Sequence, residues 1–296
     1  MVKTPLFKGS CTAIVTPFTE HGVDYERLKK NLDYQYENGT AAVLVCGTTG
    51  EASTLSEEEH NEAVRFVVNH TGGRMKVIAG IGSNNTKTAL EKAENAKAAG
   101  ADGVLMVTPY YNKTTQKGLI EHFTYVADRV DLPMILYNIP SRTGIGISAE
   151  SYAELSRHPN INGAKEASGD FALIYKVRSQ CGDELFLWSG NDDNTVPMMA
   201  MGALGVISVA SNIVPAVIAK LCALCLDGEY PTAMELFSRY NTLFSALFVE
   251  TNPIPVKAAM KLLDMDSGIL RLPLTSPSEE HLLYLKNTLR DIGLKV

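Results

Sequence analysis

The sequence lacks an excess of basic residues, paired cysteines and an apolar signal segment, which are typical of nucleic-acid-binding, disulfide-rich and secreted proteins. Its 296 residues carry a net charge of −6 and a pI near 5.6, so it lacks the basic surface by which proteins bind nucleic acid or anionic membranes. Its five cysteines are scattered and odd in number, which does not fit a disulfide framework. The N-terminal segment has no apolar signal core. We therefore expect a cytoplasmic protein that binds neither nucleic acid nor membrane.

One long stretch, residues 195–219, lacks charge altogether and is long enough to suggest a membrane span. It is interrupted by residues that would break a helix exposed to lipid, namely Pro197, Gly202, Gly205, Asn212 and Pro215. We expect instead a buried helix, strand and helix in succession. Cys222 and Cys225 form a lone CxxC without a second pair or a nearby histidine, so we assign them to a buried helix face rather than to a metal.

The sequence does contain a regular alternation of short apolar runs with amphipathic segments. We expect eight strands, at residues 11–15, 42–46, 76–80, 103–107, 134–138, 161–165, 185–189 and 205–209. Most are continuous apolar runs, as expected for parallel strands buried on both faces. Strands that are each followed by a helix-length segment predict an α/β fold, a (β/α)8 TIM barrel. A doubly wound open sheet is the alternative, although no GxGxxG follows the first strand.

Several helices have readable ends, and the pattern changes near the C-terminus. Asp24 is a candidate N-cap for a helix that Gly39 ends, and residues 56–59 form a capping box. Beyond the barrel the pattern is wholly helical, with a second capping box at residues 276–279. We expect a catalytic barrel at residues 1–225 and a C-terminal helical appendage at residues 226–296.

Lys165 and Tyr137 each end a buried strand, and strand ends converge on one pocket in a barrel. An amine can attack a keto group to form a Schiff base, and a phenol can move protons as the carbinolamine loses water. Burial favours the neutral amine. The alternatives are a solvated charge and an ion-pair partner, and the strand before Lys165 is too apolar for a solvated lysine. Tyr137 could simply pack with its hydroxyl satisfied. Its position one strand from the lysine favours catalysis.

The other strand ends offer hydroxyls but no histidine, Ser-His-Asp set, GxSxG or P-loop. Thr48 and Thr49 lie in a glycine-bounded turn, which either binds a small carboxylate or is mere turn chemistry. Arg142, in a loop at the barrel mouth, is either a surface arginine or, as we favour, a carboxylate clamp. Asp192 and Asp193 have no third ligand in sequence range. Helix capping explains them better than a metal, and we expect no metal site.

Six motifs occur in order along the chain. They are Gly-Thr-Thr-Gly-Glu at 47–51, Thr-Pro-Tyr-Tyr-Asn-Lys at 108–113, Tyr-Asn-Ile-Pro-Ser-Arg-Thr-Gly at 137–144, Lys-Glu-Ala-Ser-Gly at 165–169, Ser-Gly-Asn-Asp-Asp at 189–193 and Asn-Pro-Ile-Pro-Val-Lys at 252–257. With them the chain resembles the dihydrodipicolinate synthase family over nearly its whole length. The resemblance implies a lyase that condenses pyruvate with L-aspartate 4-semialdehyde for diaminopimelate and lysine synthesis, without a cofactor.

The resemblance also implies the catalytic roles. Lys165 would form the Schiff base with pyruvate, and Tyr137 would donate and accept protons. Thr48 and Tyr111 would complete a hydroxyl relay to solvent. In the family the tyrosine matching Tyr111 reaches across a tight dimer into the neighbour's pocket, and two dimers form a homotetramer.

Substrate contacts follow from the same resemblance. Thr49, Ile207 and Gly190 would line the pyruvate site, and Arg142 would hold the carboxylate of the incoming aldehyde. Two rivals remain open: a sister pyruvate aldolase such as N-acetylneuraminate lyase, and a barrel that binds keto acids without turnover. The threonine pair, the tyrosine pair and Arg142 together favour the synthase.

Members of the family that lysine inhibits bind it in a pocket next to the paired tyrosines. The resemblance matches three residues of that pocket here, which are His60, Asn84 and Tyr110. Two positions depart from it: Glu57 replaces a histidine, and Thr88 replaces a glutamate that pairs with an amino group of lysine. We therefore expect lysine to inhibit this chain weakly or not at all.

Overall fold

Eight parallel strands close into a barrel in the computed structural model, which describes residues 3–296. The strands are β1 (Gly9–Ala13), β4 (Ala42–Val45), β5 (Lys76–Gly80), β6 (Gly103–Val107), β7 (Met134–Asn138), β8 (Ile161–Glu166), β9 (Phe186–Ser189) and β10 (Gly205–Ser208). β1 pairs in parallel with both β10 and β4. The predicted (β/α)8 barrel is confirmed, and the open sheet is wrong because no edge strand is left in the closed barrel.

The first strand is displaced from its predicted range of 11–15. It begins at Gly9 and ends at Ala13. Val15 leaves the ladder because its N–H donates to the side chain of Asn212 (3.2 Å) rather than to a neighbouring strand. The other seven strands lie within one residue of their predicted ends.

Consecutive strand residues point alternately into the barrel and toward the helices. In β7, Ile135 and Tyr137 belong to the interior cluster, whereas Leu136 belongs to the outer one. Both clusters are buried, which explains why the strands are continuous apolar runs rather than alternating ones. Since Lys165 pairs with Tyr137 in register, the two side chains share the interior face.

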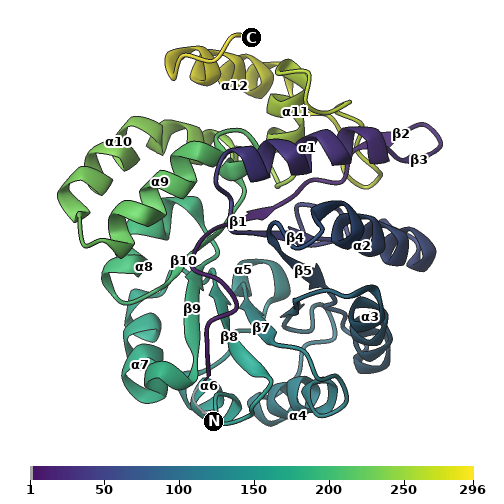
Figure 1. The fold of residues 1–296 in the computed structure, drawn as a ribbon, viewed down its shortest axis with the longest axis vertical. Helices are drawn as coiled ribbons and strands as arrows, with labels where there is room; N and C mark the ends of the chain where they lie inside the picture. The colour runs from purple at the N-terminus through teal and green to yellow at the C-terminus, as the bar shows by residue number, and fades with distance from the viewer. Residues whose placement is uncertain (1–2) are drawn as a thin grey trace.

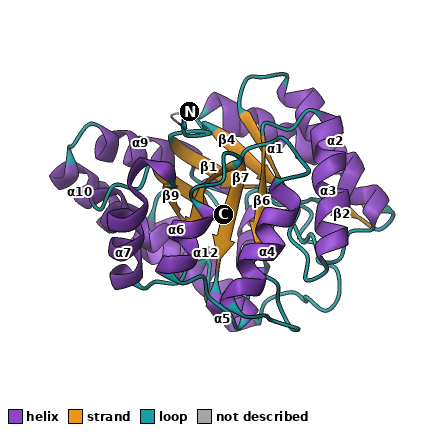
Figure 2. Ribbon diagram, turned by 90° about the horizontal axis from the view of Figure 1, so that it is seen from below, coloured by secondary structure: helices purple, strands orange, loops and turns teal. Residues whose placement is uncertain are grey.

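Helices surround the strands, as the ring of coiled ribbons in Figures 1 and 2 shows. They are α1 (Tyr25–Glu37), α2 (Glu57–Thr71), α3 (Thr86–Ala99), α4 (Gln116–Ala127), α5 (Pro140–Thr143), α6 (Ala149–Leu155), α7 (Phe171–Cys181), α8 (Thr195–Ala200) and α9 (Pro215–Leu226). Short 3₁₀ segments are η1 (Gly182–Glu184), η2 (Asp192–Asn194) and η3 (Ala210–Asn212). A small hairpin of β2 (Phe18–Thr19) and β3 (Gly22–Val23) was not predicted from the sequence.

Local signals set the helix ends where they were predicted in α1 and α2. The Asp24 side chain accepts from the N–H of Arg27 at the start of α1. Ser56 and Glu59 form a reciprocal capping box at the start of α2, which satisfies two N–H groups that would otherwise lack partners. Gly39 ends α1 as predicted: it follows the C-cap Asn38 with a φ of 79°, and its N–H donates to the carbonyl of Tyr36.

The charge-free stretch folds as predicted into a helix, a strand and a helix, namely α8, β10 and α9. Cys222 and Cys225 are free thiols on the buried side of α9, so their predicted packing role is confirmed. No helix within residues 3–296 is both long and apolar enough to cross a membrane.

The C-terminal region consists of α10 (Tyr230–Ala246), α11 (Ile254–Leu262) and α12 (Glu279–Asp291). α10 packs on α9, and α12 packs on α10 and α11, which places the chain's end beyond the barrel in Figure 1. The capping box predicted at 276–279 is wrong. Ser278 is the N-cap of α12 and accepts from His281 N–H, because Glu250 holds the N–H of Ser278 and fixes it outside the helix.

Candidate active site

Tyr137 and Lys165 lie side by side on two hydrogen-bonded strands. The register pairs Tyr137 of β7 with Lys165 of β8, and Lys165 Nζ lies 4.3 Å from the centre of the Tyr137 ring. Each residue is 5% exposed. A phenol and an amine on neighbouring side chains, both shielded from bulk water, are the groups that Schiff-base chemistry on a carbonyl compound uses.

Gly190 leaves the space in which the end of Lys165 lies. A Cβ added at position 190 would lie 2.7 Å from Ala167 Cβ and 3.2 Å from Lys165 Cε. Trp188 is the register neighbour of Lys165 on β9, and Phe7 stacks on its indole with ring centres 4.8 Å apart. The Lys165 side chain therefore has the apolar rings of Trp188 and Phe7 on one side and Gly190 next to its end.

Glu166 follows Lys165 but points to the opposite face of the strand, where three residues fix its carboxylate. Asn138 Nδ2 donates to both carboxylate oxygens (3.1 and 2.9 Å), Tyr152 donates its hydroxyl (2.9 Å) and Ser168 its N–H (2.8 Å). Burial and the Glu166 charge raise the pKa of Tyr152 well above its usual value, so its phenol remains a donor. This network was not predicted from the sequence, although Asn138 and Glu166 each lie one residue beyond the predicted catalytic pair.

A cavity of about 420 Å³ lies at the carboxyl ends of β4 to β7. Of the predicted site residues, Thr48, Tyr137 and Arg142 line it, and Tyr110 lines it as well. Lys92 of α3 also reaches the cavity, a cation that the motifs did not indicate. The cavity is wide enough for a small keto acid and a second small molecule.

Five of the predicted site residues do not line this cavity. Lys165 of β8 and Gly190, which follows β9, lie next to each other beside Tyr137. Ile207 is fully buried in the interior cluster that contains Tyr137, and Thr49 is 3% exposed in the turn after β4. Tyr111 is 91% exposed and has a φ of 69°, a conformation that is unfavourable for an aromatic residue. Its side chain is not brought to the cavity of its own chain.

Arg142 lies in α5, a single turn at the mouth of the cavity. Its Nη2 donates to the backbone carbonyl of Asn252 (3.1 Å). The hydroxyl of Thr143, the next residue, bonds the carbonyl of Ile145 (2.8 Å) and accepts from Thr108 Oγ1 (3.0 Å). These bonds fix the turn while the Arg142 side chain remains exposed enough to meet a ligand.

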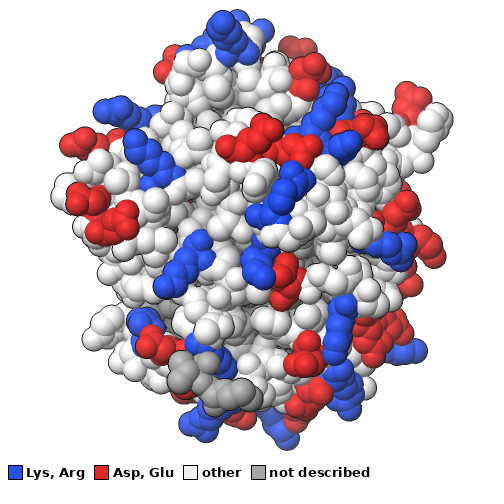
Figure 3. Space-filling view, viewed as in Figure 1, with Lys and Arg blue, Asp and Glu red and all other residues white. Residues whose placement is uncertain are grey.

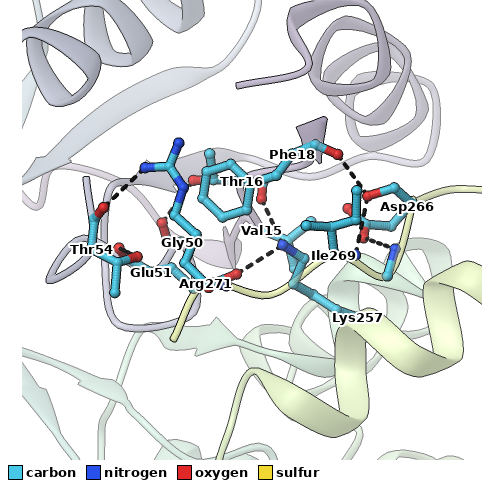
Figure 4. A network of polar contacts seen from close by, with 12 residues as sticks. Val15, Thr16, Phe18, Gly50, Glu51, Thr54, Lys257, Asp266, Ile269 and Arg271 are labelled. Carbon is cyan, nitrogen blue, oxygen red and sulfur yellow. Dashed lines mark hydrogen bonds and ion pairs between the residues drawn. The ribbon is translucent and has the colours of Figure 1, made fainter. Parts of the chain in front are cut away.

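The turn that carries Thr48 and Thr49 is held from the C-terminal region, as Figure 4 shows. Its last residue, Glu51, is fully buried and accepts from Lys257 Nζ of α11 (2.8 Å) and from the N–H of Arg271 (3.1 Å). Lys257 also donates to the carbonyl of Thr16 (2.9 Å) and lies over the Phe18 ring, 4.3 Å from its centre. A charged pair this deep requires nearly complete hydrogen bonding, and it fixes the turn to the appendage.

Asp192 caps neither η2 nor α8, the two helical segments next to it in the chain, but its carboxylate does cap the more distant η3. Its buried carboxylate accepts from Ser208 Oγ (2.5 Å) and from the N–H groups of Val209 and Ala210 (3.0 and 2.9 Å) at the start of η3. Burial raises the pKa of this carboxyl, although the three donors oppose the shift. Within residues 3–296 no three histidine, cysteine or acidic side chains gather as metal ligands would.

An interior lysine beside a tyrosine, at the carboxyl end of a (β/α)8 barrel and next to a cavity, defines a class of enzymes that act on carbonyl compounds through an amine.

On the face that Figure 3 shows, acidic and basic side chains are interspersed.

Comparison with known proteins agrees with this class. The model of the dihydrodipicolinate synthetase family matches residues 6–292. The 4-hydroxy-tetrahydrodipicolinate synthase of Thermoanaerobacter sp. (strain X514) is 50% identical over 98% of each chain. The crystal structure of dihydrodipicolinate synthase from Aquifex aeolicus has a TM-score of 0.96 at 46% identity, covering 98% of this chain and 100% of that one. The enzyme from Cyanidioschyzon merolae, crystallised with lysine bound, has a TM-score of 0.95 at 41% identity, covering 99% and 100%. The chain belongs to the dihydrodipicolinate synthetase family and is a lyase.

Substituting Lys257→Met should destabilise the protein and lower its activity. The change leaves the Glu51 carboxylate buried without its cation, a loss that typically costs about 3–5 kcal/mol. Chemical denaturation followed by circular dichroism measures the free energy of unfolding. The double variant Glu51→Gln with Lys257→Met should recover part of the loss, because no unpaired charge is left.

Lys76→Met is the matched control, since Lys76 pairs with Asp102 (2.6 Å) at the protein surface. An exposed pair contributes about 0–1 kcal/mol, so this variant should unfold close to the parent. If Lys257→Met were no more damaging than Lys76→Met, the buried pair would not anchor the turn.

Proposed function

We propose that Lys165, Tyr137 and Thr48 carry out this protein's 4-hydroxy-tetrahydrodipicolinate synthase activity, a step of diaminopimelate and lysine synthesis. In this reaction pyruvate condenses with L-aspartate 4-semialdehyde. The observation that carries the assignment is the in-register pairing of Tyr137 with Lys165 beside the cavity. The chemistry needs an amine and proton-transfer groups, and no cofactor.

The lysine acts first. The neutral amine of Lys165 attacks the keto carbon of pyruvate, and loss of water from the carbinolamine leaves an imine. The imine draws electrons from the neighbouring methyl group, so loss of a methyl proton gives an enamine that attacks the aldehyde. The amino group of the second substrate then displaces Lys165 and closes the ring. Lys165 Nζ lies 4.3 Å from the centre of the Tyr137 ring, and we assign to the hydroxyl of that ring the protons that these steps transfer.

Thr48 continues the proton path from Tyr137, since both hydroxyl residues line the same cavity. Tyr111 would complete the path, but in its own chain it is 91% exposed. An exposed tyrosine with a φ of 69° is a costly arrangement unless another molecule covers it. We therefore place Tyr111 in the cavity of a second copy, within a dimer that pairs again to form a homotetramer.

The two substrates are acids, and the site offers a separate donor for each. Thr49, Ile207 and Gly190 surround the pyruvate bound to Lys165, and Gly190 leaves room for the end of the Lys165 side chain. Arg142, at the cavity mouth, holds the carboxylate of the aldehyde through charge-assisted bonds. All five cysteines are free, which suits the reducing cytoplasm where we place the reaction.

Lysine should not be an effective inhibitor of this protein. Tyr110 of the family's lysine pocket also lines the cavity, together with Lys92, so a lysine bound next to Tyr110 would be repelled by the ammonium group of Lys92. The Lys92 charge already affects its surroundings: burial lowers the pKa of His60, and Lys92 lowers it further. Thr88 supplies no compensating carboxylate.

Trapping the imine tests the proposed function. Pyruvate with sodium borohydride should attach one reduced pyruvate to each chain, and peptide mass spectrometry should place it on Lys165. Lys257 should stay unmodified because its ammonium is buried and paired. Lys165→Arg should be nearly inactive, since a guanidinium stays protonated and cannot attack a carbonyl.

The acceptor decides between the family's chemistries. Pyruvate consumption should be fastest with aspartate 4-semialdehyde and negligible with N-acetylmannosamine or glyceraldehyde. Preference for N-acetylmannosamine would indicate a sister aldolase, and a label on another lysine would overturn the mechanism. Pyruvate binding with neither a label nor turnover would indicate a keto-acid-binding barrel.

Removing the hydroxyl of Tyr137 or Thr48 should slow turnover without unfolding the protein. A lost proton-transfer group typically costs about 100-fold to 10,000-fold in rate. Tyr137→Phe and Thr48→Val keep most of the side-chain volume, so circular dichroism should match the parent while kcat falls. Turnover within threefold of the parent, at unchanged pyruvate KM, would show that the hydroxyl is not part of the proton path.

Turnover measured against added lysine should fall by less than half at about 1 mM. Losing an acidic partner for a desolvated ammonium costs on the order of 2–5 kcal/mol, or roughly 30-fold to several-thousand-fold in affinity. Thr88→Glu combined with Lys92→Leu should create lysine sensitivity, whereas either change alone should do so less. Half-inhibition of the parent well below 1 mM would mean that the pocket still accepts lysine.

A further inference from the structure

Asn252 lies between two predicted substrate contacts and bonds to both. Its side-chain Nδ2 donates to Thr49 Oγ1 (3.0 Å), and its backbone carbonyl accepts from Arg142 Nη2 (3.1 Å). The residue is 5% exposed and does not line the cavity itself. It therefore touches the residues that meet the substrates rather than the substrates.

The bond to Thr49 controls which way that hydroxyl can donate. A threonine hydroxyl has one proton and two lone pairs, and Asn252 Nδ2 occupies a lone pair. The Thr49 proton is then free to point toward another acceptor, and a substrate carboxylate is a strong one. Had Asn252 offered an oxygen instead, the Thr49 proton would have been used within the protein.

The buried Oδ1 of Asn252 supports this direction of donation. Within residues 3–296 it has no hydrogen-bond partner. Turning the amide over would exchange this unpaired oxygen for an unpaired N–H, and buried N–H groups without partners are the rarer case. The Asn252 amide therefore donates to Thr49 and leaves its own oxygen without a partner. The unpaired oxygen lowers the stability of the protein.

The same residue restricts Arg142. Its guanidinium has five N–H donors in a rigid plane, and the Asn252 carbonyl binds one of its terminal nitrogens. With that nitrogen held, the remaining donors keep a fixed direction at the cavity mouth. Preorganised donors bind a carboxylate with less loss of side-chain entropy than mobile ones do.

Asn252 can hold both residues because the chain around it is itself fixed. It precedes α11, in which Lys257 N–H bonds the Pro253 carbonyl (3.0 Å) and Lys257 Nζ is paired with Glu51. Glu51 and Thr49 belong to one turn, so residues 252–257 contact that turn at two points. The C-terminal region thereby forms part of the wall behind the substrate site.

We propose that Asn252 is a positioning residue of this reaction: it directs the Thr49 hydroxyl toward the pyruvate carboxylate and fixes Arg142 for the aldehyde. The proposal rests on the roles proposed above for Thr49 and Arg142. It assigns to the C-terminal region a part in substrate binding in addition to its packing on the barrel.

Asn252→Asp tests the proposal because a carboxylate has nearly the same shape but only accepts hydrogen bonds. The Thr49 proton would turn toward it, and the pyruvate KM should rise about tenfold or more, the effect of losing a hydrogen bond to a charged group. The backbone bond to Arg142 remains, so the aldehyde KM should change less than about threefold. Arg142→Ala should show the opposite pattern.

A double-mutant cycle separates action through Thr49 from direct repulsion of pyruvate by a new charge. In a Thr49→Val background, Asn252→Asp should raise the pyruvate KM by less than about twofold, since there is no hydroxyl left to direct. A tenfold rise in that background would overturn the proposal. If Asn252→Asp does not fold, Asn252→Leu takes its place in the same cycle. In the parent background it should raise the pyruvate KM about threefold.

Asn162→Asp is the matched control for placing a carboxylate where a buried amide was. Asn162 Nδ2 bonds the Thr4 carbonyl (2.8 Å) at the start of β8, away from the cavity, so only stability should change. Borohydride labelling of Lys165 is measured in every variant. If the parent is labelled and Asn252→Asp keeps the parent's pyruvate KM, only the role of Asn252 is overturned; if the parent is not labelled, the proposed function fails first.

Discussion

The pairing of β7 with β8 is the constraint on which the site depends. A parallel register places Tyr137 opposite Lys165 and, one residue on, Asn138 opposite Glu166. The first pair enters the barrel and the second faces the helices, because neighbouring residues of a strand point to opposite faces. The outer pair is hydrogen-bonded and resists slipping. A shift of one residue would exchange the faces and remove the amine from the interior.

The C-terminal region has a second function beyond covering the barrel. Through residues 252–257 it contacts the turn that carries Thr48 and Thr49, once by the buried pair of Lys257 with Glu51 and once by Asn252. Burying two charges is unfavourable unless both are fully hydrogen-bonded. These two contacts hold the turn in place and restrict its motion. The hydroxyls of Thr48 and Thr49 therefore keep fixed directions.

Much of this was readable from the sequence, and the omissions share a cause. Continuous apolar runs ending in Tyr137 and Lys165 predicted both the barrel and the two strand ends. The contact of Lys257 with Glu51 could not be read locally, because it joins a helix to a turn far away along the chain. The capping box failed because two serines flank Pro277, and only the contact with Glu250 selects Ser278. Runs of buried residues can therefore be predicted from the local sequence, whereas polar contacts between distant parts of the chain cannot.

A crystal structure of the protein soaked in pyruvate tests the central claim most directly. The account predicts continuous electron density from Lys165 Nζ to the keto carbon, with the pyruvate carboxylate within hydrogen-bond distance of Thr49 Oγ1 and the Tyr137 hydroxyl next to the new bond. Pyruvate bound in the cavity without density to Lys165, or joined to another lysine, would contradict it.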